Sequence, residues 1–197
     1  MGARHILYPM AGVVVLAAVV AVVVDRWPHE DHVVVVGDSM AYLATDQLRS
    51  AGDAAHLEIT VDARAGVELS ARFDDIRRAV GSGAQRLVIE LGTNDVLANT
   101  AVASIDTLVD QTVTDVQSVR CVVFVNVGLL AGPTDLADHF NEQLRDAVAL
   151  HPNEHIFDWS SLYHRHPAWT ADNVHIQAPY VPLYAEAIVT AVADACH

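Results

Sequence analysis

Residues 33–40 of the chain, Val-Val-Val-Val-Gly-Asp-Ser-Met, decide the fold class that the sequence predicts. The four valines form an unbroken apolar run, which is typical of a strand buried on both faces of a parallel sheet. Gly37 ends this run, and residues 39–50 have the pattern of a helix. The stretch therefore predicts a strand, a tight turn and a helix, with Ser39 where the strand gives way to the helix.

The same alternation of short β-prone runs and longer helical segments continues to the end of the chain. Further strands are expected over residues 56–61, 86–91, 121–127 and 156–157, and further helices over 67–80, 101–119, 136–150 and 180–195. Strands that alternate with helices imply a parallel sheet covered on both faces. We therefore expect residues 33–197 to form a doubly wound, flavodoxin-like α/β domain with five parallel strands in three layers.

An apolar segment precedes this domain. Residues 6–24 carry no charge, and about 20 such residues span a bilayer as a helix. Arg4 lies before the segment, so the positive-inside rule places the following chain outside the cytoplasm. Two interpretations stay open: residues 1–24 are an uncleaved signal anchor in the cell membrane, or a signal peptide whose cleavage releases a secreted protein. Residues 25–32, with Pro28, are interpreted as a juxtamembrane linker.

The composition excludes several classes of function. The chain has 25 acidic and 11 basic residues, a net charge of −14, and no lysine. Such a charge without a basic run argues against nucleic-acid binding. The absence of lysine excludes a P-loop lysine and a Schiff-base lysine.

The only two cysteines are Cys121 and Cys196. Two cysteines cannot build a Cys-rich zinc site, and no metal is expected. The last helix should run back from the active edge of the sheet and finish near the start of the strand that Cys121 opens. A disulfide between them is one alternative, and a buried Cys121 thiol with a loose terminal Cys196 is the other.

Candidate catalytic residues follow the predicted strands. In doubly wound sheets, ligands bind at the carboxyl ends of the strands. Ser39 would lie there at a helix N-terminus, where unpaired N–H groups favour a developing negative charge. His175 occurs in the last loop with Asp172 three residues earlier, and the Asp172 carboxylate could orient the imidazole ring. Gly66 and Asn94 occur in neighbouring loops.

These residues resemble the four signature blocks of the SGNH/GDSL hydrolases, in order. The segments 37–40 (GDSM), Gly66, 92–95 (GTND) and 172–175 (DNVH) look like the four blocks. The resemblance implies that Ser39 is the nucleophile, His175 the general base and Asp172 the residue that orients it. It also implies an oxyanion hole formed by the Ser39 N–H, the Gly66 N–H and the Asn94 amide, and a reaction that needs no cofactor. We interpret Asp38 and Asp95 as structural residues that bond loop backbone.

Finer features resemble the SGNH domains of peptidoglycan O-acetyltransferases. These features are residues 62–64, Asn141, residues 158–159 and Trp169. Trp169 is a candidate for lining the substrate pocket, and plain packing is its alternative role. The glycine that usually follows the catalytic His is absent, and so is a multi-span acyl-donor module. A transferase would therefore need a separate acyl-donor membrane protein.

Three functions follow as hypotheses. The first is an extracytoplasmic serine esterase acting on small acyl esters, with acetylated wall or surface glycans as candidate substrates. The second is an O-acetyltransferase that uses the same Ser-His-Asp triad. The third is a catalytically silent glycan-binding module. The triad does not encode the acceptor, so the sequence leaves hydrolysis and transfer open.

Overall fold

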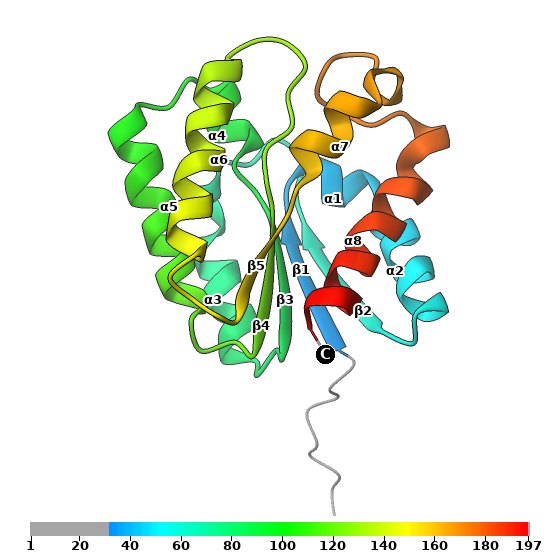
Figure 1. Ribbon diagram of the computed structural model, residues 1–197. Helices are drawn as coiled ribbons and strands as arrows, with labels where there is room; N and C mark the ends of the chain where they lie inside the picture. The colour runs from blue at the N-terminus through cyan, green and yellow to red at the C-terminus, as the bar shows by residue number, and fades with distance from the viewer. Residues whose placement is uncertain (1–31, 197) are drawn as a thin grey trace, which may run out of the picture.

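The structure, a computed structural model, describes residues 32–196. Five parallel strands form one sheet in the order β2-β1-β3-β4-β5 (Figure 1). The strands are β1 His32–Gly37, β2 Glu58–Ala63, β3 Arg86–Glu90, β4 Cys121–Val125 and β5 Glu154–Phe157. The α-helices are α1 Ser39–Leu43, α2 Thr45–Ala54, α3 Phe73–Gly81, α4 Thr93–Leu97, α5 Val102–Val116, α6 Thr134–Val148, α7 Trp159–Arg165 and α8 Val181–Ala195. Short 3₁₀ helices are η1 Leu69–Arg72, η2 Pro167–Trp169 and η3 Ala178–Tyr180.

Helices cover both faces of the sheet, as the unbroken apolar strands predict. Val34 and Val36 of β1 pack in the core that contains residues of α3, α5 and α6. Val33 and Val35 point the other way, into the core that contains residues of α1, α2 and α8. The two helical layers stand on either side of the sheet in Figure 1. The predicted three-layer, five-stranded parallel fold is therefore confirmed.

Three local predictions were wrong. Asn94 was expected in a loop, but it lies in a short helix, α4, that was not predicted. The predicted helix over residues 39–50 is two helices, α1 and α2, which meet at Ala44 and extend to Ala54. A further helix, α7, follows β5 directly, where no helix was predicted. Asp158 caps α7, because its side chain accepts a hydrogen bond from the Ser161 backbone N–H. An Asp directly before a helix is a local capping signal that hydrophobic periodicity does not reveal.

The N-terminal predictions lie mostly outside the described residues. Residues 1–24 and 25–31 are not described, while His32, assigned to the linker, is the first residue of β1. Within residues 32–196, no helix combines the length and the apolar character that crossing a membrane requires.

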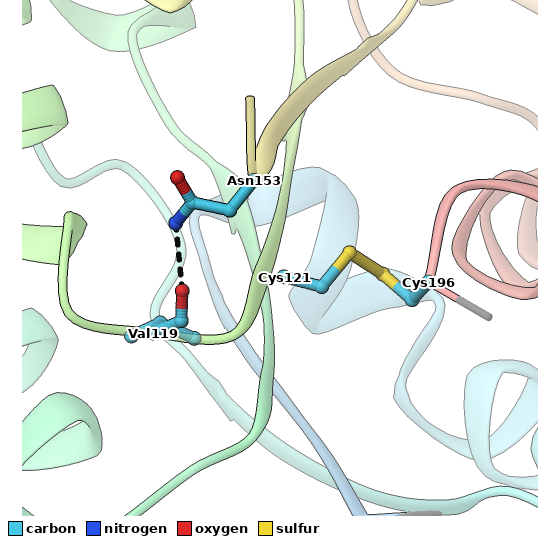
Figure 2. The surroundings of a disulfide bond; sticks show 4 residues. All are labelled: Val119, Cys121, Asn153 and Cys196. Carbon is cyan, nitrogen blue, oxygen red and sulfur yellow. Dashed lines mark hydrogen bonds between the residues drawn. A yellow bond between two sulfur atoms is a disulfide. The ribbon is translucent and has the colours of Figure 1, made fainter. Parts of the chain in front are cut away.

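A disulfide joins Cys121, the first residue of β4, to Cys196 at the C-terminal end of α8 (Figure 2). Their Cα atoms are 5.6 Å apart, and both residues are buried. Beside the bond, the Asn153 side chain donates a hydrogen bond of 2.7 Å to the Val119 carbonyl, which fixes the turn before β4. Of the two alternatives for the cysteines, the structure therefore contains the disulfide.

Candidate active site

Ser39 occupies the first position of α1, directly after the turn that ends β1. The turn is tight at Gly37, where an added Cβ would collide with Ala41 and crowd the Glu90 carboxylate. Asp38 caps the helix, since its Oδ1 accepts a hydrogen bond of 3.1 Å from the Met40 N–H. The turn thus presents the Ser39 side chain at the carboxyl edge of the sheet.

His175 and Asp172 approach Ser39 from the loop between η2 and η3. The Ser39 Oγ lies 3.0 Å from His175 Nε2, and His175 Nδ1 lies 2.8 Å from Asp172 Oδ2. Asn173, between the two loop residues, has a φ of 67°, a left-handed conformation that Asn tolerates better than most residues. The three side chains form one hydrogen-bonded relay, although Ser39 and His175 are 136 residues apart in sequence.

The Asp172 carboxylate is held in its ionised form. Partial burial raises its pKa, but four hydrogen bonds outweigh that effect and bring the pKa well below the ordinary value for Asp. The donors are the His175 ring, the His175 and Val174 backbone N–H groups, and the Thr170 hydroxyl. An ionised Asp172 beside His175 Nδ1 favours the tautomer that leaves Nε2 free to accept the Ser39 proton.

Asn94 lies in the first turn of α4, next to the Ser39 turn. Gly92, with a φ of 112°, begins this helix, and an added Cβ there would run into the Phe140 ring. The Asn94 Nδ2 donates a hydrogen bond of 2.9 Å to Asp38 Oδ2. An amide nitrogen carries two hydrogens, so one hydrogen of Asn94 remains for another acceptor.

Gly66 lies in an exposed turn after β2, with a φ of 71°. Backbone and side-chain hydrogen bonds hold the turn on both sides. The Arg64 N–H donates to the Gly37 carbonyl at 3.1 Å, and the Leu69 N–H donates to Asp95 Oδ2 at 2.9 Å. The turn that contains Gly66 is therefore attached to the Ser39 turn at one end and to the α4 segment at the other.

Trp169 lies in an aromatic stack at the start of the loop that carries His175. Its ring is parallel to the His166 ring, with centroids 4.4 Å apart, and also stacks on Tyr180 at 5.8 Å. Trp159 of α7 lies 6.3 Å from it. The Trp169 carbonyl accepts a hydrogen bond of 2.7 Å from the Gln177 N–H. These contacts brace the loop between Trp169 and Gln177, which contains Asp172 and His175.

Sequence reasoning missed Glu90, the last residue of β3. It is 4% exposed, and its Oε2 accepts hydrogen bonds from the Asp38 and Ala41 N–H groups. The available signal was an acidic residue at the carboxyl end of the otherwise apolar stretch Leu87–Ile89, because acidic side chains are rarely buried without partners.

No protein-family profile and no curated protein matches the sequence. Among solved structures, the catalytic domain of Streptococcus pneumoniae peptidoglycan O-acetyltransferase A, with a methylsulfonyl adduct, is 18% identical, with a TM-score of 0.68 and coverage of 84% of this chain and 92% of that one.

An acetyl xylan esterase, AlAXEase, is 14% identical, with a TM-score of 0.68 and coverage of 82% and 99% of the two chains. A lipolytic protein of the G-D-S-L family from Desulfitobacterium hafniense is 14% identical, with a TM-score of 0.67 and coverage of 81% and 98%. The fold of this chain is therefore that of the SGNH/GDSL hydrolases.

Proposed function

We propose that the protein is a serine esterase that hydrolyses small acyl esters through an acyl-Ser39 intermediate. The observation that carries the proposal is the relay from Ser39 Oγ to His175 Nε2 at 3.0 Å and from His175 Nδ1 to Asp172 Oδ2 at 2.8 Å. A serine hydroxyl becomes an effective nucleophile when a positioned base accepts its proton and a third group orients that base.

In the proposed reaction, Ser39 Oγ attacks the ester carbonyl carbon while His175 Nε2 takes its proton. The tetrahedral intermediate collapses, the bond to the alcohol oxygen breaks, and His175 returns the proton to the leaving alcohol. Water then attacks the acyl-Ser39 ester by the same steps and releases the carboxylic acid. The Ser39 N–H, the Gly66 N–H and the second Asn94 amide hydrogen serve as donors to the oxyanion.

A second candidate is an O-acetyltransferase that passes the acyl group from Ser39 to a sugar hydroxyl. The fold is shared with a peptidoglycan O-acetyltransferase catalytic domain and with an acetyl xylan esterase. Both of these proteins are named for acetyl chemistry on a polysaccharide, which supports an acetylated glycan as the substrate. In the transferase case, the acyl group would come from a separate donor protein in the membrane.

We also propose that the catalytic domain works outside the cytoplasm, tethered to the cell membrane by residues 6–24 or released by their cleavage. Two features support this location. The apolar segment has the length of a membrane span, and the Cys121–Cys196 disulfide is a bond typical of oxidising compartments. Fractionation of cells that express the full chain with a C-terminal tag would test the location, with the tag reached by protease in intact spheroplasts as the expected result.

The test of the esterase proposal uses the purified full chain with p-nitrophenyl acetate and a fluorophosphonate that labels activated serines. Ser39→Ala should abolish both hydrolysis and labelling. Ser160→Ala is the matched control, because Ser160 also lies in the first turn of a helix that follows a strand. This control should keep both signals.

Wild-type protein that neither labels nor hydrolyses would overturn the proposal and favour the silent glycan-binding module. Adding acetylated and unacetylated glycan acceptors separates the two enzymatic candidates. Formation of additional acetylated glycan together with a lower release of free acetate identifies transfer. An unchanged release of acetate identifies hydrolysis.

A further inference from the structure

The Glu90 carboxyl group lies directly beneath the Ser39 turn, buried between β3 and the start of α1. Its Oε2 accepts hydrogen bonds from the Asp38 N–H at 3.2 Å and from the Ala41 N–H at 3.0 Å. The Asp38 N–H donates at 3.0 Å to the Glu90 carbonyl as well. Because these two amides lie on either side of Ser39, Glu90 fixes the backbone that carries the reacting hydroxyl and its own N–H.

Asp38 continues this connection to the other side of the site. Its side chain interacts directly with the Glu90 carboxyl group, and its Oδ2 accepts the hydrogen bond from Asn94 Nδ2 at 2.9 Å. The orientation of the Asn94 amide thus depends on where the Asp38 carboxylate lies. Asp38 and Glu90 together link two groups that the proposed reaction needs to hold in register, the Ser39 turn and the Asn94 amide.

We propose that Glu90 is a positioning residue, which holds the Ser39 turn and, through Asp38, sets the direction of the Asn94 amide. This inference rests on the proposed esterase function. Glu90 touches no reacting atom in the proposed esterase reaction, so its effect should appear in the rate of the chemical step rather than in substrate binding.

The surroundings of Glu90 favour the neutral form of its carboxyl group. Burial, followed by the negative charge of Asp38, raises the pKa of Glu90 well above its ordinary value. Burial also raises the pKa of Asp38, which hydrogen bonds and the nearby His175 counteract. Two further titratable groups face this pair: Tyr184 of α8, whose pKa burial raises well above its ordinary value, and Asp95 of α4, whose pKa burial also raises. Since the pKa of Glu90 is raised further than that of Asp38, we assign the proton of this pair to Glu90.

A neutral Glu90 also suits the reaction. Two adjacent carboxylates beneath the Ser39 turn would oppose the negative charge that develops on the substrate oxygen. A single shared proton leaves Asp38 as an acceptor for Asn94 and removes the second charge. Ionisation of Glu90 should therefore slow the reaction at alkaline pH.

The test compares Glu90→Gln and Glu90→Ala in the full chain. Glu154→Gln and Glu154→Ala are matched controls, because Glu154 is also 4% exposed but lies at the start of β5, at the opposite edge of the sheet. Glu90→Ala should lower kcat about 10²-fold, since misplacement by about 1 Å can cost that much, and leave KM within about threefold. Glu90→Gln should keep kcat within about threefold at neutral pH and lack the alkaline decline of the wild type.

A second measurement does not depend on activity. Amide hydrogen exchange should be faster at Ala41 in Glu90→Ala, whereas Asp38 keeps its bond to the backbone carbonyl of residue 90. Exchange should be unchanged in Glu90→Gln, because the Gln amide oxygen still accepts both bonds. Wild-type kcat in Glu90→Ala, or equal losses in Glu90→Ala and Glu154→Ala, would overturn the positioning role. A loss in Glu90→Gln as large as in Glu90→Ala would overturn the neutral form. Failure of the wild type to hydrolyse esters, with the exchange pattern as expected, would count against the esterase function alone.

Discussion

Asp172 holds His175 at two points, since its Oδ2 lies 2.8 Å from the ring Nδ1 and its Oδ1 accepts the backbone N–H at 2.7 Å. One carboxylate therefore fixes both the ring and the main chain of the same residue. A spacing of three residues in a loop permits this arrangement, because the intervening Asn173 adopts a left-handed conformation. The imidazole ring is oriented locally, without support from a distant strand.

The substitution Asp172→Asn should lower kcat about 10³–10⁴-fold, because an amide no longer favours the tautomer with a free Nε2. Asp95→Asn is the comparison, since Asp95 is a buried carboxylate that accepts the Leu69 N–H. An Asn oxygen can keep that bond, so the loss there should be at most about tenfold. Steady-state hydrolysis of p-nitrophenyl acetate measures both. A larger loss in Asp95→Asn would show that Asp95, rather than Asp172, is the carboxylate that supports His175.

The substitution Asn94→Ala should reduce kcat about 10²–10³-fold, the usual cost of removing one oxyanion donor. The variant also leaves Asp38 without one of its hydrogen-bond donors, so a small loss of thermal stability should accompany it. Asn99→Gly is a suitable control, because Asn99 follows α4 with a φ of 56° that Gly tolerates. Full turnover by Asn94→Ala would remove Asn94 from the oxyanion hole.

Reduction of the disulfide should destabilise the fold without slowing catalysis. The bond joins residues 75 apart in sequence, and the chain-entropy model gives about 4 kcal/mol for a loop of that size. The double variant Cys121→Ala, Cys196→Ala should show the lower stability in urea unfolding, whether or not reductant is present. Because the bond lies at the edge of the sheet opposite Ser39, kcat should stay within about twofold. A large drop in the kcat of the fully folded double variant would contradict the expectation that the disulfide does not affect catalysis.

Glu154 should make the wild type less stable as pH rises. Burial raises its pKa to about 7, so the folded state binds this proton more tightly than the unfolded state. The stabilising effect is complete below about pH 4.5 and is lost as pH rises to about 7, a difference of about 3 kcal/mol. Glu154→Gln, which cannot ionise, should be the more stable protein at pH 8 and not at pH 4.5. Chemical denaturation at the two pH values measures the free energy of unfolding of each protein. An equal change with pH in both proteins would refute the prediction.

The sequence predicted the fold well because apolar runs report burial directly. Val33–Val36 and Cys121–Val125 are continuous apolar segments with few alternatives to a central parallel strand. The boundary at Ala44 was missed because no Gly or Pro marks it. Helix α7 was missed because its start depends on the side-chain cap at Asp158. Such a cap leaves no trace in the periodic pattern of apolar residues.

The candidate site could be predicted only where a residue acts through its own chemistry. Ser39, His175 and Asp172 are reactive residue types that follow predicted strands, with Asp172 only three residues before His175, and the structure brings all three within hydrogen-bonding distance. Glu90 has no such mark in the sequence, because its partners are backbone N–H groups of a segment about 50 residues away. The bond between Asn94 and Asp38 is equally a product of the tertiary fold.

The direction of β1 sets which way the site faces. The strand starts at His32 and ends beside Ser39, a rise of about 20 Å over six residues. Cys196 is bonded to the start of β4, so both ends of the described chain leave from the edge opposite Ser39 (Figure 1). An anchor joined to either end of the described chain would therefore lie on the side of the domain opposite the active site. On a cell surface, such a mounting would point the reacting hydroxyl outward, towards polymers above the attachment plane rather than the lipids within it.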